Sequence, residues 1–157
     1  MLIDISYFMK GERQLMNANN KPVASNEVAV KTFVDGYIES LEEKFLTNMV
    51  GKDLCESMMS AESVEVTQSI KDKLKESFAD YVFYHILRDM NETTTITGVV
   101  RVKNANTYVS PIHRQTSVWN SMVDRNRAFV EWASSDECPI KIRISKNMLT
   151  YINSMNL

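Results

Sequence analysis

Residues 78–90 constrain the fold most, because almost every position in this segment is apolar or aromatic. The segment reads FADYVFYHILRDM. A helix that is apolar all round has no face to leave in water, so other elements have to enclose it. We therefore predict a central helix that begins between Ser63 and Ser69 and runs to about Met90. It is packed by its own bundle, or by a neighbouring subunit as well.

Three further segments carry helical signals. The Ser25-Asn26 pair is of the type that caps helix N-termini, and apolar residues follow it at steps of three and four as far as Gly51. A short helix is expected at 52–60, and the Ser110-Pro111 pair predicts the start of a helix that runs to about residue 134. The side chains that we expect in the core are Phe33, Tyr37, Leu41, Phe45, Leu74, Phe78, Val82, Ile86, Trp119, Met122, Val123 and Val130.

A polar stretch rich in β-branched residues, Asn91–Asn106, separates the last two long helices. Gly98 divides it and is expected to form a hairpin turn or a bulge. Beyond Gly98, valines alternate with Arg101 and Lys103, so we expect one face that docks on protein and one that is charged. The stretch has too few large apolar side chains to join the core. We predict an arm that meets something outside its own domain.

The two ends of the chain carry weaker signals. Residues 1–24 are expected to form a tail that docks on its own core or on a neighbour, with a short strand possible at 2–5. Isoleucines alternate with charged residues at 140–144, which indicates a half-buried strand, and Ser145 is a suitable cap for a short terminal helix. The predicted fold is mainly α: one domain, 25–157, built as a bundle of about four to five helices, with the arm at about 91–106 and a short C-terminal strand.

Charge and cysteine content exclude some classes of protein. The chain has 157 residues and a net charge of −2, so it is no polycation built to coat nucleic acid. Two cysteines in a long helical chain make no disulfide framework. The N-terminus lacks a basic region before an apolar run, and no apolar stretch approaches the roughly 20 residues that span a bilayer, so we expect a soluble intracellular protein that does not bind membranes.

A DNA-binding function is the alternative that the sequence leaves open. Five basic residues cluster around the arm and the helix that follows it, and an outward-facing set of such residues can contact phosphates. Asp124 and Glu131 lie on the same helix and weaken this interpretation. The five are Arg101, Lys103, Arg114, Arg125 and Arg127.

Catalytic and metal-binding signatures are missing from the sequence. There are two histidines and no Cys-x-x-Cys pair, whereas a metal site usually needs three or four ligands. His85 lies in the aromatic helix and is expected to be a hydrogen-bonded core residue, while His113 is expected at the surface or at an interface. An enzyme with a centre at Cys55 or His113 is the third alternative; Cys55 could act with a histidine elsewhere, but no local motif supports it. We expect no enzyme activity, no metal and no cofactor.

The order of these elements resembles a known family. A capped helix carries LEEKFLTNMVGKDL at 41–54, the central helix carries 78–90, a Thr-rich segment ends TGVVRVK at 97–103, and VSP at 109–111 precedes VWNSMVD at 118–124. The chain resembles the small helical head–tail connector (adaptor) proteins of tailed bacteriophages, especially a type found in phages of gut Bacteroidales. The likeness covers roughly residues 26–133, and the two ends depart from it.

The resemblance implies a structural function in the virion. Connectors of this kind form homo-oligomeric rings, commonly of twelve subunits, in the neck below the portal protein, and they are assembled in the host cytoplasm. The bundle builds the ring wall, an extended loop or hairpin reaches a neighbour or the portal, and DNA passes through the channel without being read. The residues that we expect at the subunit or partner interface are Ile96, Val100, Arg101, Val102, Lys103 and Arg114.

Overall fold

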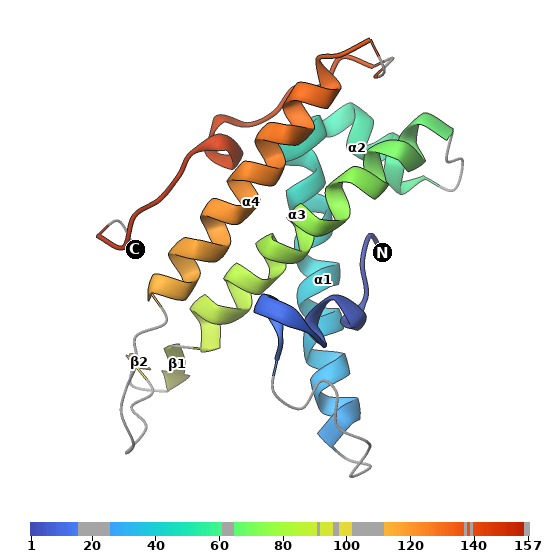
Figure 1. Ribbon diagram of the computed structural model, residues 1–157. Coiled ribbons are helices and arrows are strands. Elements are labelled where there is room, and N and C mark those ends of the chain that lie inside the picture. Colours follow the sequence, from blue (N-terminus) through green and yellow to red (C-terminus); the bar gives the residue numbers. More distant parts are fainter. Residues whose placement is uncertain are drawn as a thin grey trace.

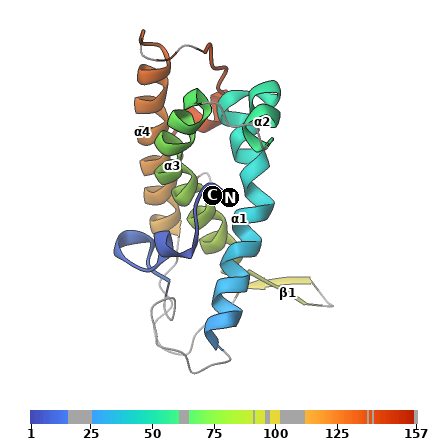
Figure 2. The same ribbon diagram turned by 90° about the vertical axis from the view of Figure 1, so that its right-hand side faces the viewer.

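Helix α3 (Glu65–Met90) is the middle element of a helical bundle (Figures 1 and 2). It packs most extensively on α4 (Ile112–Ala133) and also packs on α1 (Asn26–Val50). The short helix α2 (Lys52–Met59) follows α1 and packs back on it.

This computed structural model describes residues 1–15, 26–60, 65–90, 92–95, 98–101, 112–136, 138 and 140–155. The mainly helical fold that the sequence predicts is confirmed.

The core lies where α3 meets both neighbours. Six residues of α3 between Phe78 and Ile86 are buried hydrophobics, as expected for a helix that is apolar on all sides. Gly51 ends α1 with a φ of 88°, a conformation that glycine adopts without strain, and its N–H donates to the carbonyl oxygen of Thr47 at 3.0 Å. The chain then turns directly into α2, which buries Cys55 and Met58.

Most side chains expected in the core are buried or half-buried, and Phe33 is the exception. Phe45, Leu74, Phe78, Val82, Ile86, Met122 and Val123 are 0% exposed, and Tyr37, Leu41, Trp119 and Val130 are half-buried. Phe33 is 44% exposed, so its assignment to the core was wrong. The inward stripe of α1 runs through Val34 and Ile38, which are both 0% exposed, and this leaves Phe33 at the edge of the stripe.

The N-terminal segment forms two 3-10 helices, η1 (Ile5–Phe8) and η2 (Gly11–Arg13), where the sequence made a short strand possible at 2–5. The strand prediction was wrong because the Asp4 carboxylate accepts a hydrogen bond from the Ser6 N–H at 2.8 Å and starts a helical turn. Phe8 is fully buried, and its ring centroid lies 6.4 Å from that of Phe83. The segment therefore docks on the chain's own core.

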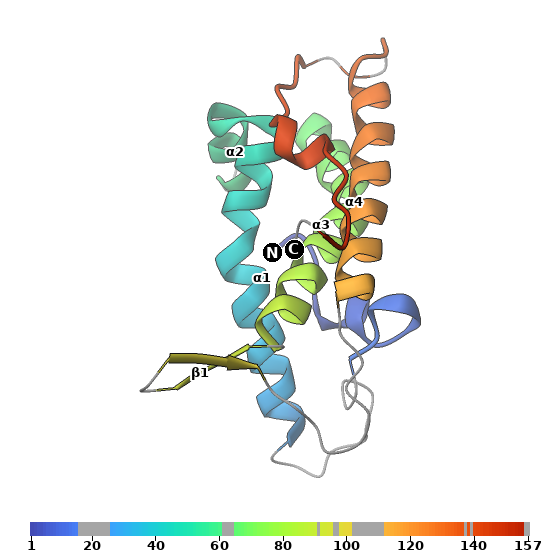
Figure 3. The ribbon, with the colours of Figure 1, turned by 90° about the vertical axis from the view of Figure 1, so that its left-hand side faces the viewer.

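The C-terminal segment runs back along α4 (Figures 1 and 3). It contains the 3-10 helix η3 (Lys146–Leu149), and no strand occurs within the described residues 140–155, so the strand expected at 140–144 was wrong. The alternating isoleucines there are half-buried against the core. Among the described residues no strand edge lies beside them; the Ser145 N–H instead donates to the carbonyl oxygen of Asn48 at 2.8 Å.

Two short strands follow α3. Strand β1 (Glu92–Thr95) pairs antiparallel with β2 (Gly98–Arg101), in a register that places Glu92 opposite Arg101 and Thr95 opposite Gly98. The strand pair extends beyond α1, on the side of the molecule away from α4 (Figures 2 and 3). Residues Asn91, 96–97 and 102–111, which include part of the expected arm and the expected Ser110-Pro111 helix start, lie outside the described residues.

Candidate assembly surface

An apolar groove opens at the end of the bundle from which the β1–β2 pair extends. Its volume is about 260 Å³, and four elements line it: the N-terminal segment, α1, α3 and α4. The lining residues are Gln14, Leu15, Val30, Phe33, Phe83, Leu87 and Arg114. Phe33 is the most exposed aromatic side chain here, and an exposed aromatic beside half-buried aliphatic residues is typical of a protein contact surface.

Arg114 lies on one wall of this groove. Its Nη2 donates to the carbonyl oxygen of Glu12 at 2.7 Å, and its guanidinium carbon lies 4.9 Å from the centroid of the Phe83 ring. Both contacts are intramolecular, and they hold the N-terminal segment against the start of α4. The residue remains exposed, so a planar charged group borders an apolar surface that a partner can reach.

Near this groove, a tyrosine of α1 binds a carboxylate of α3. The hydroxyl of Tyr37 donates to the Asp89 carboxylate at 3.0 Å, and the Arg88 Nε donates to the same carboxylate at 2.8 Å. Burial, together with the bond to Asp89, raises the pKa of Tyr37 to about 12, so this hydroxyl remains a donor. The ring of Phe33 lies 5.0 Å from that of Tyr37 and is held at a defined place on the surface.

A buried carboxylate joins three elements on the other side of the N-terminal segment. Asp80 of α3 is 4% exposed and lies between Arg13 of the N-terminal segment and Arg125 of α4. The Arg125 Nε donates to Asp80 at 2.8 Å, and Arg13 lies 3.5 Å from its second oxygen while also pairing with Glu76. Burial raises the pKa of Asp80, and the two guanidinium groups oppose that rise. This cluster serves packing, because each charge in it has a partner.

The two histidines lie in different environments. His85 is 8% exposed, makes edge-on contacts with the rings of Tyr81 and Tyr84, and has an Nε2 without a hydrogen-bond partner among the described residues. The sequence predicted His85 as a hydrogen-bonded core residue. The side chain is buried, but its Nε2 lacks the predicted hydrogen bond within the described residues. Burial, with smaller effects from Arg88 and Lys44, lowers the pKa of His85 to about 4. His113 is exposed in the first turn of α4.

The residues considered for nucleophilic chemistry occupy unrelated places. Cys55 is buried, and its sulfur contacts the carbonyl oxygen of Glu43 at 3.7 Å and the sulfur of Met59 at 3.9 Å. Cys138 is half-buried, and both thiols are free. Within the described ranges no group of three or more His, Cys, Asp or Glu side chains is placed to hold a metal ion.

The basic cluster behind the DNA-binding alternative is largely engaged inside the molecule. Arg125 pairs with Asp80. Arg127 donates to the carbonyl oxygen of Leu149 at 3.2 Å and lies 4.2 Å over the ring of Tyr151. Arg114, Arg125 and Arg127, three of the five basic residues, therefore contact other segments of the same chain. These contacts weaken the DNA-binding interpretation.

The remaining residues predicted at an interface are placed only in part. Val100 and Arg101 belong to β2, whose backbone alone is described, and Ile96, Val102 and Lys103 lie outside the described residues. Leu15, Val30 and Leu87 were not singled out as surface residues. The sequence does contain a pattern that indicates this surface. Val30, Phe33 and Tyr37 follow one another at steps of three and four, which marks a second apolar edge on α1.

Comparison with known proteins returned no matching family model, no matching curated protein and no matching solved structure. Within the described residues, no helix is both long and apolar enough to cross a membrane.

Proposed function

We propose that this chain is a structural subunit of a tailed-phage head–tail connector. In this proposal it forms a homo-oligomeric ring, of about twelve copies in the resembled family, between the portal protein and the tail. The ring lines the DNA passage, belongs to the virion and is assembled in the host cytoplasm. The chain acts by assembly and carries no catalytic step, no metal and no cofactor.

The β1–β2 pair is the observation that supports the proposal most. Within the described residues it is a sheet of two strands that extends past α1 from the end of α3. A lone two-stranded pair is marginally stable in water, and its outer edges carry unpaired backbone groups that favour a further strand. Strand addition by a neighbour would satisfy those groups, with main-chain hydrogen bonds supplying affinity. We infer that this pair is part of the assembly arm predicted at about 91–106, for which the sequence pattern assigns Val100 and Val102 to a docking face and Arg101 and Lys103 to a charged face.

The apolar groove at the same end supports the same interpretation. Phe33 and the half-buried Leu15, Val30 and Leu87 place a contact surface beside the root of the arm. A ring subunit needs such a surface, because an arm alone offers little apolar area to a neighbour. The resemblance over residues 26–133 supplies the identity of the partners: the next subunit, the portal and adjoining neck proteins.

The test is the composition of purified virus particles that encode this chain. Mass spectrometry of gradient-purified particles should detect the chain in a fixed ratio to the portal protein, and electron cryomicroscopy should place its density in the neck. Treatment of the particles with salt and nuclease should leave the chain attached. Particles that lack the chain would overturn the proposal.

A further inference from the structure

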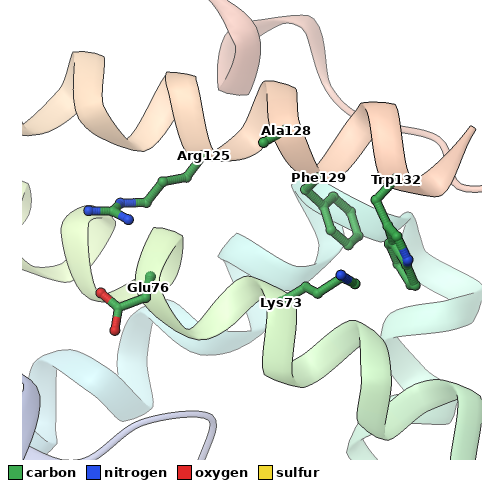
Figure 4. A pocket seen from close by; sticks show the side chains of 6 residues that line it. All are labelled: Lys73, Glu76, Arg125, Ala128, Phe129 and Trp132. Atoms are coloured by element: carbon green, nitrogen blue, oxygen red, sulfur yellow. The ribbon is translucent and has the colours of Figure 1, made fainter.

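A second groove lies between α3 and α4, on another part of the surface. Its volume is about 280 Å³. Lys73 and Glu76 come from α3, and Arg125, Ala128, Phe129 and Trp132 come from α4 (Figure 4). Phe129 is 3% exposed and forms the floor, while Trp132 is half-buried at one end with its ring centroid 5.7 Å from that of Phe129. The groove therefore joins an aromatic floor to a charged rim.

The rim of this groove presents positive charge to an incoming group. The Lys73 ammonium lies 4.7 Å from the centroid of the Trp132 ring and forms no ion pair within the described part of the chain. At the opposite end of the groove Arg125 uses its Nε for Asp80, which leaves its other donors available (Figure 4). Glu76, the one carboxylate of the rim, is already paired with Arg13. An acidic group with an apolar neighbour fits this arrangement.

Helix α2 carries a surface of the complementary kind. Asp53, Glu56 and Met59 follow one another at steps of three, so they form a ridge, and all three are exposed. Met59 is 55% exposed, which is unusual for so large an apolar side chain. Among the residues that the structure describes, Glu56 forms one ion pair, with Lys52 at 3.7 Å, and both side chains are more than two-thirds exposed. Such an exposed pair contributes little to stability, so either charge can exchange its partner for a better one.

The two surfaces are placed for contact between copies of the chain. Helix α2 lies on the α1 side of the molecule, whereas α4 lies on the other side, and both surfaces belong to the same end of the bundle (Figures 2 and 3). Complementary surfaces on opposite sides make a head-to-tail contact, which generates a ring when the rotation closes. Their common level along the bundle suits a ring whose axis runs parallel to the helices.

We propose that a second copy of this chain occupies the α3–α4 groove, with α2 of one subunit seated on the groove of the next. Met59 rests against the half-buried ring of Trp132, where a thioether contacts an aromatic ring favourably. The carboxylates of Asp53 and Glu56 lie against Lys73 and Arg125. This inference rests on the proposed ring-forming function and names the contact that builds the ring wall.

The first experiment uses cysteine cross-linking between two variants of the full chain. Lys73→Cys is made in one copy and Glu56→Cys in the other, both with Cys138→Ser so that buried Cys55 is the remaining native thiol. The copies are mixed at about 1 mM, where a contact with a Kd near 1 mM is roughly half occupied, and treated with a short bis-maleimide. The control replaces Lys73→Cys by Asn147→Cys, an exposed position on the C-terminal segment.

The proposal expects the Lys73→Cys copy to give about tenfold more heterodimer than the Asn147→Cys control, the ratio produced by even a modest specific contact. Equal yields from the two pairs would overturn it. The yield should fall as salt concentration rises, because Asp53 and Arg125 still pair charges across the contact when Lys73 and Glu56 are replaced.

The second experiment exchanges charges across the contact. Lys73→Glu in all copies should reduce incorporation into particles by about tenfold or more, since like charges then face each other. Glu56→Lys should do the same, and a chain carrying both changes should recover most of the loss. Lys141→Glu, an equal charge change on an exposed residue of the C-terminal segment, should have no effect. Absence of recovery in the double variant would overturn the proposal.

The two proposals fail in different ways. Particles that contain the chain without the Lys73–Glu56 cross-link would refute the α2 contact and leave the connector function standing. A specific cross-link between purified chains, with no chain in the particles, would refute the connector function and leave the contact standing.

Discussion

The Nε of Arg125 lies 2.8 Å from the carboxylate of Asp80, so a nearly buried acid on α3 is held by a half-exposed base on α4. Arg13 approaches the same carboxylate from the N-terminal segment at 3.5 Å. Three segments that are distant in the sequence therefore meet at one charge.

Arg125→Ala should lower the free energy of unfolding by about 1.5–3 kcal/mol, because it removes a charged hydrogen bond and leaves Asp80 with Arg13 alone. Chemical denaturation followed by circular dichroism measures this loss. Arg127→Ala is the matched control: Arg127 also lies exposed on α4, and its contacts with the Leu149 carbonyl oxygen and the Tyr151 ring are at the surface, so their loss should cost less than about 1 kcal/mol. Equal losses in the two variants would show that Asp80 does not need Arg125.

His85 should make the protein less stable as the pH falls below about 6.5. The pKa of His85 is lowered to about 4 in the folded state from 6.5, so the unfolded chain binds a proton that the folded chain refuses. His85 therefore does not lower the free energy of unfolding above about pH 6.5, and lowers it progressively as the pH falls toward 4. At pH 5 this loss should be about 2 kcal/mol.

Denaturation curves at several values between about pH 5 and 7.5 test this dependence. His85→Gln should flatten the curve in this range, because an amide does not titrate there. His113→Gln, the same substitution at an exposed histidine, is the control for the exchange itself. A His85→Gln variant that keeps the full pH dependence would assign it to other groups.

Trp119→Ala should destabilise the subunit by somewhat less than the about 3–5 kcal/mol typical of a fully buried Trp, because this side chain is half-buried. The indole packs 4.9 Å from the ring of Tyr84 and donates from Nε1 to the carbonyl oxygen of Thr150 at 2.9 Å. Trp119→Phe keeps a ring and loses the hydrogen bond, so it should cost about 1 kcal/mol. Thermal melts of both variants measure the difference, and unchanged melting of Trp119→Ala would place the residue at an interface.

Phe33 and Val34 are neighbours in the chain with opposite expected effects. Val34 is 0% exposed, and Val34→Ala should cost about 1.5–3 kcal/mol of stability. Phe33→Ser should cost less than about 1 kcal/mol but should reduce incorporation into particles, because it removes an aromatic from the apolar groove. Melting curves and particle composition are measured for both. A Phe33→Ser chain that incorporates normally would remove this groove from the assembly surface.

Deleting Glu92–Lys103 and closing the gap with a short Gly-Ser linker should leave the helical circular dichroism signal intact while abolishing incorporation. The described buried hydrophobic residues of α1, α3 and α4 pack in one cluster, so we expect the bundle to fold without the arm. A control that replaces the same residues by a Gly-Ser segment of equal length separates loss of the arm from a change in loop length. Loss of helical signal in both would mean that the arm is needed for folding.

The helical part of the fold was predictable because its signals are local. The apolar content of 78–90 indicated a central helix, and Gly51 marked the end of α1 before any contact was known. The two strand predictions at the chain ends failed for a common reason. Alternation reports which side chains are buried, whereas a strand also needs a neighbouring edge, and neither 2–5 nor 140–144 has one within the described residues.

The candidate surfaces depended on relations that the sequence does not display. Asp80 and Arg13 are separated by most of α1, α2 and α3, and nothing in the local pattern pairs them. Phe33 belonged to an apolar stripe whose centre, at Val34 and Ile38, is set by where α3 crosses α1. The groove at Lys73 and Trp132 needs the exact pairing of two helices, which periodicity alone cannot supply.

Two asparagines of α4 hold the C-terminal segment through its backbone. Asn120 exchanges two hydrogen bonds with the main chain of Ile152, at 3.1 and 3.0 Å, and buried Asn126 donates to the carbonyl oxygen of Met148 at 2.8 Å. These hydrogen bonds use the backbone N–H and C=O groups of the segment, which do not depend on its side chains. The exposed side chains of the segment can therefore be substituted more freely than the two asparagines. Sequence diversification among relatives should accordingly concentrate on the exposed positions of 146–155, while Asn120 and Asn126 stay fixed.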